Sequence, residues 1–119
     1  MPHYVECSWT LHPGTFWDEV SFNVTLPAEL EKVDPMIAKA GSDYVGYVWK
    51  DWPAALSIGR PAQGASEDDG LHLQTIANGV RLEVALELKH ERPWGDAKAL
   101  AAIAKHVLQA LPADVATKL

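Results

Sequence analysis

The chain has 119 residues and a formal net charge of −6 at neutral pH. This length supports one folded domain with its own core, and we expect residues 1–119 to form a single domain. Lys and Arg form no cluster in the sequence, which argues against nucleic acid as a partner, because binding to a phosphate backbone requires such a cluster.

Two alternating segments at the start of the chain predict a β-hairpin. They are Tyr4–Leu11 and Phe16–Leu26, with a turn at residues 12–15. Their apolar positions share one face and are Val5, Cys7, Trp9, Leu11, Val20, Phe22, Val24 and Leu26. Cys7 is the single cysteine, which excludes an internal disulfide framework and agrees with a reducing compartment. We expect it to be a small core residue, because no base can be placed beside its thiol.

A helix-prone segment and a third strand follow. Pro27–Ala40 favours short helical pieces, one of them starting at Asp34-Pro35. Tyr44–Trp49 alternates with large apolar groups on both faces, which predicts a central strand. We expect Trp9 and Trp49 to lie in the core.

The next segment predicts a short strand and a long connection. Ala54–Ile58 is expected to resume a strand. Gly59–Gly70 contains four glycines or prolines that interrupt regular structure, so it is expected to be a polar loop. This loop carries the acidic run Glu67-Asp68-Asp69.

Asn78-Gly79 marks the clearest hairpin of the chain. A type I′ turn needs positive φ at both central residues, and Asn-Gly is the pair that adopts it most readily. With these two residues in the turn, the apolar face holds Leu71, Leu73, Thr75, Ala77, Val80, Leu82, Val84 and Leu86. The opposite face pairs Ile76 with Arg81, Gln74 with Glu83 and His72 with Ala85, and we expect it to be open to solvent.

An amphipathic helix is predicted after this hairpin, with Asp96 as its N-cap and Pro112 beyond its end. Its apolar stripe contains Leu100, Ile103, Ala104, Val107, Leu108 and Leu111. The stripe and the apolar face of the hairpin complement one another. We therefore predict an α+β domain, in which an antiparallel sheet of five or six strands is packed on one face by the C-terminal helix and a short helical segment follows the first hairpin.

No catalytic or metal-binding motif is present. The five histidines lack metal-ligand spacing, and His72 and His90 would need a further ligand, so we predict no metal and no cofactor. Glu6, Glu19, Glu83 and Glu87 project from polar faces, where we expect solvated carboxylates and surface histidines.

Peripheral tryptophans and the acidic run provide the candidate binding surface. Trp17, Trp52 and Trp94 lie beside prolines, glycines or charges, where an indole can anchor a partner or cap the core. Acidic side chains steer basic partners. The predicted partner-binding residues are Trp52, Glu67, Asp68, Asp69 and Trp94.

The sequence shows no signal peptide and no apolar run of transmembrane length, which predicts a cytoplasmic protein without a membrane partner. In size and charge the chain resembles bacterial immunity proteins, a resemblance that covers no motif and no residue. It implies a non-enzymatic inhibitor that binds a basic protein. The alternative is a small-ligand-binding domain or small enzyme with a pocket between sheet and helix, and a homodimer is compatible with either.

Overall fold

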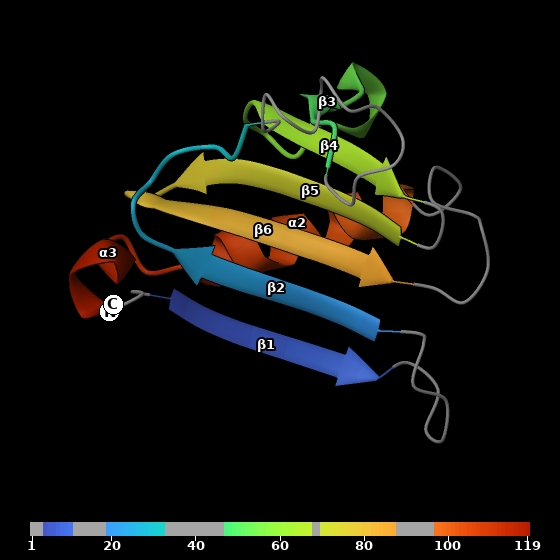
Figure 1. Ribbon diagram of the computed structural model, residues 1–119. Coiled ribbons are helices and arrows are strands. Elements are labelled where there is room, and N and C mark those ends of the chain that lie inside the picture. Colours follow the sequence, from blue (N-terminus) through green and yellow to red (C-terminus); the bar gives the residue numbers. More distant parts are fainter. Residues whose placement is uncertain (1–3, 11–18, 33–46, 68–69, 88–96) are drawn as a thin grey trace.

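The computed structural model describes residues 4–10, 19–32, 47–67, 70–87 and 97–119 (Figure 1). Its strands are β1 (Tyr4–Thr10), β2 (Glu19–Thr25), β3 (Lys50–Asp51), β4 (Ala62–Glu67), β5 (Gly70–Ala77) and β6 (Val80–Glu87). Its helices are the 3₁₀ helix η2 (Ala54–Leu56), α2 (Ala97–Ala110) and α3 (Val115–Lys118). The six strands form one antiparallel sheet in the order β1-β2-β6-β5-β4-β3, and α2 packs on β5 and β6. The predicted α+β fold is confirmed.

The β5–β6 hairpin forms as predicted. Asn78 and Gly79 have φ angles of 50° and 77°, as a type I′ turn requires. The register pairs Ala77 with Val80 and continues without a bulge to Gly70 and Glu87. The side-chain amide of Asn78 also donates to the carbonyl oxygens of Leu111 and Pro112, at 3.3 and 3.1 Å, so the turn is tied to the end of α2.

The core lies between this hairpin and α2. On the sheet side, Leu71, Leu73, Leu82 and Val84 are fully buried. On the helix side, the buried residues are Ala97, Leu100, Ala101 and Ala104. Ile103 and Val107, predicted within the stripe, pack against this core from its margin and are half-buried. The predicted N-cap Asp96 lies outside the described residues.

The first hairpin also forms, but at the edge of the sheet. Cys7 pairs with Phe22, and the faces are those predicted. Trp9, however, is 52% exposed, so its expected core position is wrong. The reason is that α2 contacts β5 and β6, whereas β1 lies two strands beyond β6 (Figure 1). Cys7 itself is half-buried.

The region before β4 corrects two predictions. The described part of Tyr44–Trp49, residues 47–49, is not a strand, and the short strand β3 begins only at Lys50. Trp49 is half-buried. Ala54–Ile58 was expected to be a strand, but its first residues form η2, which begins after Pro53. Proline lacks the N–H that a strand would donate, and its fixed φ suits the start of a helical turn.

The predicted loop Gly59–Gly70 contains the strand β4 instead. This strand pairs with β5 over its whole length. Its residues are mostly small (Ala62, Gly64, Ala65 and Ser66), so the hydrophobic alternation that marks a strand is missing from the sequence. Residues 27–32 contain no helix, and the helix expected from Asp34-Pro35 lies outside the described residues.

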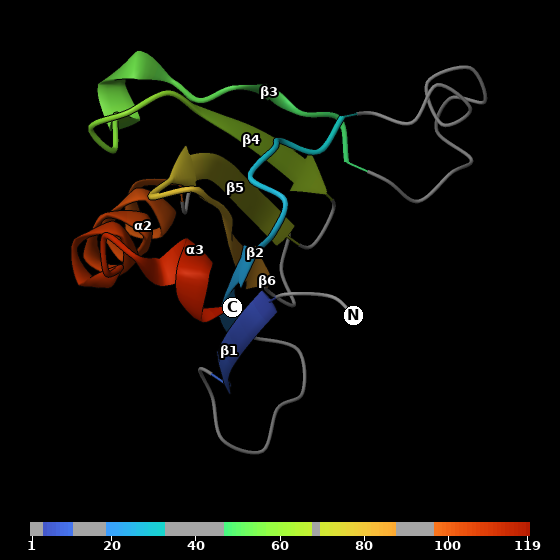
Figure 2. The same ribbon diagram turned by 90° about the vertical axis from the view of Figure 1, so that its left-hand side faces the viewer.

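The face of the sheet opposite α2 was expected to be open, and over β4, β5 and β6 it is not. His72, Gln74, Arg81 and Ala65 on this face are at most 6% exposed. Figure 2 shows residues 26–32, which follow β2, crossing the sheet on the side away from α2 and α3, and we call these residues the crossing chain. Among the described helices, none is long and apolar enough to span a membrane.

Candidate functional site

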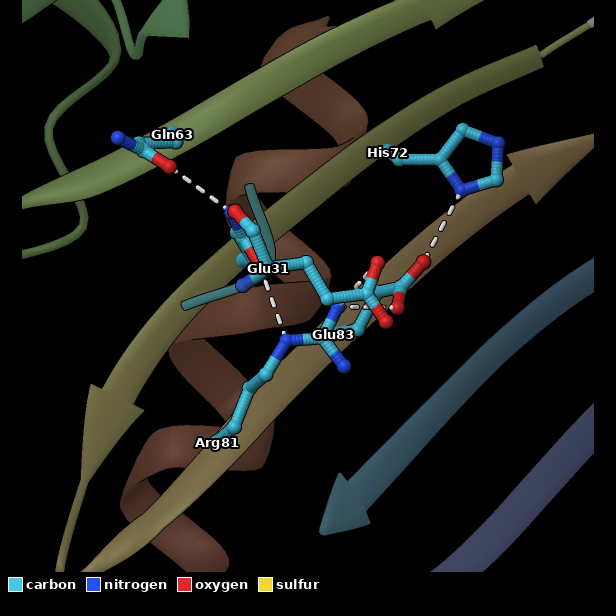
Figure 3. A network of polar contacts seen from close by, with 6 residues as sticks. Glu31, Gln63, His72, Arg81 and Glu83 are labelled. Atoms are coloured by element: carbon cyan, nitrogen blue, oxygen red, sulfur yellow. Dashed lines mark hydrogen bonds and ion pairs between the residues drawn. The ribbon is translucent and has the colours of Figure 1, made fainter. Parts of the chain in front are cut away.

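A buried polar network joins the crossing chain to the sheet (Figure 3). At its centre, the side-chain amide nitrogen of Gln74 donates to the backbone carbonyl of Glu31 at 3.1 Å and to the side-chain oxygen of Gln63 at 2.8 Å. Its amide oxygen accepts from the Glu31 backbone N–H and from Arg81 Nε, both at 3.0 Å. Both donors and both acceptor positions of this fully buried amide are therefore used.

The charged part of the network centres on Arg81. Its Nη2 donates to Glu83 Oε2 at 2.7 Å and lies 3.4 Å from Glu31 Oε2. The side chains of Arg81 and Glu83 are 7% and 12% exposed, whereas that of Glu31 is 54% exposed. The buried pair is thus Arg81–Glu83, and Glu31 closes it from the solvent side.

His72 completes the network on the β5 side. Its Nδ1 lies 3.3 Å from Glu83 Oε1, and its ring lies against Tyr47 with centroids 4.1 Å apart. Tyr47 lies just before β3. Glu31, after β2, and Tyr47, before β3, therefore both contact side chains of the β5–β6 hairpin.

Glu83 is held as a carboxylate. Burial by itself would raise its pKa, but the bond with His72 and the charge and bond of Arg81 outweigh burial, so that the pKa lies below the usual value of 4.5. The negative charge of Glu83 is therefore committed to two internal partners.

A histidine oriented by a carboxylate is an arrangement that general bases use. Here His72 is only 1% exposed, so the pair is closed to a substrate in this conformation. The network therefore has a structural role. It gives buried polar groups hydrogen-bond partners and holds the crossing chain on the sheet.

The sequence did not reveal this network. His72 and Glu83 were expected on the surface, which is wrong for both, because that expectation assumed a solvated face. The local signal was the hairpin register, which predicted that His72, Gln74, Arg81 and Glu83 share one face of the hairpin. Glu31 is 43 residues from Gln74 along the chain, so no local pattern joins them.

Trp52 is part of the core. It is 8% exposed, and its indole N–H donates to the Leu56 carbonyl at 2.8 Å. A Cβ atom at Gly64 would lie 2.6 Å from Trp52 Cε3, so the indole packs against a strand position that only glycine leaves open. In this position Trp52 offers little surface to a partner.

Glu67, the first residue of the acidic run, lies at one end of the sheet. It is the last residue of β4 and pairs with Gly70, which pairs in turn with Glu87. Glu87 pairs with Glu19 of β2. The backbone register thus aligns Glu19, Glu87 and Glu67 in one row across β2, β6, β5 and β4, with Gly70 between the last two. We call these three residues the acidic row.

No Lys or Arg occupies this row or the next one on the same face. The next row consists of Ser21, Ala85, His72 and Ala65. Like charges directly opposite one another on adjacent strands are unfavourable for stability. The register places Glu19 and Glu87 directly opposite one another, so two carboxylate residues are neighbours at this end of β2 and β6.

The other predicted binding residues, Asp68, Asp69 and Trp94, lie outside the described residues, as does His90. Within the described ranges, no group of three or more His, Cys, Asp and Glu side chains is placed to hold a metal ion.

A hollow of about 610 Å³ lies beside β3 and η2, and Trp52, Pro53, Arg60 and Pro61 contribute to its lining. One guanidinium nitrogen of Arg60 donates to the Ile76 carbonyl at 2.7 Å. This hollow is open and lies at the β3–β4 edge, whereas the pocket considered from the sequence would lie between sheet and helix.

Models of protein families, curated proteins and solved structures were all compared with the chain, and none of them matches it.

Proposed function

We propose that this chain is a non-enzymatic binding protein of the immunity or inhibitor type, which holds a basic protein partner against the acidic row. One observation carries the proposal, namely the alignment of Glu19, Glu87 and Glu67 across four adjacent strands. The net charge of −6 supports it, because negative potential accelerates encounter with a basic partner.

The non-enzymatic part of the proposal is supported by the buried network. The His72–Glu83 pair is closed to substrates, and the Glu83 carboxylate already has two internal partners. Trp52 is not included in the proposed surface, because its indole is used in the core. Asp68 and Asp69 follow Glu67 directly in the sequence, so the local sequence adds two further acidic residues.

The test compares two triple variants with equal loss of charge. One is Glu19→Gln, Glu67→Gln, Glu87→Gln, and the other, in exposed residues elsewhere, is Glu29→Gln, Asp51→Asn, Asp114→Asn. The probe is the product of a neighbouring gene, with association measured by stopped flow at several salt concentrations. We expect the first variant to associate about tenfold more slowly at low salt and the second to change much less. Equal effects of both variants would contradict a localised acidic surface.

A further inference from the structure

The edge strand β1 exposes large apolar side chains on both of its faces. Val5 and Trp9 are 48% and 52% exposed on the α2 side, and Tyr4 is 52% exposed on the opposite side. Within the described part of the chain β1 pairs with β2 alone, and Figure 1 shows it as the outermost strand of the sheet. Every second residue of such a strand directs its backbone N–H and C=O away from the sheet. A further strand could therefore pair with it.

Among the residues that the structure describes, nothing protects this edge in the usual way. Native edge strands are typically short, bulged, or interrupted by Lys or Pro. β1 has seven residues, contains neither Lys nor Pro, and pairs with β2 at every position without a bulge. These features make β1 suited to pairing with a further strand.

We propose that the occupant of this edge is a second copy of the chain, whose β1 pairs antiparallel with this β1 about a two-fold axis at Cys7. Two residues directly opposite one another on antiparallel strands project to the same face of the sheet. The two-fold axis must therefore lie between one residue and its own copy, because an axis between two successive residues would pair residues of opposite faces. An axis at Cys7 uses all seven residues, pairing position 4 with 10, position 5 with 9, position 6 with 8, and Cys7 with its own copy.

The strand is complementary to itself in this register. Val5 meets the partner's Trp9, and Trp9 meets the partner's Val5, so that both exposed apolar residues on the α2 side gain an apolar neighbour. In β2, Val24, Phe22 and Val20 pair with Val5, Cys7 and Trp9. The apolar rows therefore continue from β2 of one copy to β2 of the other.

Charge selects the same register and the same occupant. Glu6, the only charged residue of β1, meets the partner's Ser8. An axis at Glu6 would place two carboxylates opposite one another, and an axis at Ser8 would place Val5 opposite position 11, beyond the end of β1. Because β1 offers a basic partner only one carboxylate, we assign this edge to a second copy, separate from the acidic row.

The single cysteine provides a direct test in the unmodified protein. Directly opposed residues of antiparallel strands have Cα atoms about 4.5 to 5.5 Å apart, which lies within the range that a disulfide can bridge. We expect sedimentation equilibrium to show a reversible dimer, and mild oxidation of the folded protein to link it through Cys7. A Cys7→Ser, Val48→Cys variant is the matched control, because Val48 is 56% exposed and lies outside β1. It should dimerise without being linked.

Substitution of the edge tests the interface without disturbing the core. Val5→Lys or Trp9→Lys should weaken dimerisation at least about tenfold, whereas Val48→Lys should not, and circular dichroism should report the same fold for all three. A protein that stays monomeric up to about 1 mM would overturn the proposal. So would a dimer that both lysine variants leave intact. Neither result bears on the acidic row, whose triple variant keeps β1 unchanged.

Discussion

Strands β5 and β6 and strands β1 and β2 obey the same alternation of apolar and polar residues, yet they differ in burial. The first pair has α2 on one face and the crossing chain on the other, and both faces of β5 are buried. In the second pair, Val5 and Trp9 remain about half exposed. The alternation therefore determines on which face of the sheet each residue lies, whereas the elements that cover the sheet determine whether that face is buried or exposed.

We call β5 and β6, with the elements that pack on them, the covered half of the molecule. The largest effect expected there comes from breaking the buried ion pair between Arg81 and Glu83. Arg81→Ala should lower the free energy of unfolding by about 3–5 kcal/mol, because Glu83 and Gln74 would each lose a buried partner. Chemical denaturation measures it. The control is Lys118→Ala, which removes an ion pair to Asp114 whose side chains are both about 60% exposed, and which should cost under about 1 kcal/mol. Similar losses for both variants would show that the network contributes no more than a surface pair.

Truncation of an apolar side chain in the same half should be the next largest effect. Leu86→Ala removes a side chain that is 6% exposed, beside Val20 and Leu71, and should cost about 2–5 kcal/mol. A matched pair compares the two halves directly. Val84→Ala at a fully buried position should cost clearly more than Val5→Ala, which should stay within about 0.5 kcal/mol in the monomer. Equal costs in denaturant melts would contradict the difference in burial.

Gly64 tests whether the margin of the covered half is as tightly packed as its centre. In Gly64→Ala the new methyl group would meet the Trp52 ring at 2.6 Å, so the indole must shift. We expect a loss of about 1–3 kcal/mol from overpacking and a change in tryptophan fluorescence. Unchanged stability and emission would show that the indole moves freely there.

The smallest expected effect is on the pH dependence of stability. The folded-state pKa of Glu83 lies below its usual value of 4.5, so the unfolded state binds a proton more readily than the folded state. The stabilisation from its ionised form is therefore complete above about pH 4.5 and is lost as the pH falls through the lower folded-state pKa. Denaturant melts between pH 3 and 7 should give free energies of unfolding for the wild type and Glu83→Gln that converge at the acid end of this range. The free energy of the variant should depend less on pH. Parallel curves would contradict this role of Glu83.

The candidate site shows how far local patterns reach. The hairpin register predicted that His72, Gln74, Arg81 and Glu83 lie together on one face of β5 and β6, which is confirmed. That this face is buried could not be predicted, because its cover includes Glu31 in the crossing chain and Tyr47 just before β3. β4 escaped prediction for a related reason, since its small residues pair through the backbone and leave no hydrophobic period.

The sequence by itself determined the Asn78-Gly79 turn, the register that follows from it, and the apolar stripe of α2, because these depend on backbone preferences and on neighbours a few residues away. Only the tertiary structure decided that β1 is an edge, that Trp52 lies in the core against Gly64, and that Glu19, Glu87 and Glu67 form one row. Each of these depends on strands from distant parts of the chain meeting in the order β1-β2-β6-β5-β4-β3, and strand order follows from how all elements share one core.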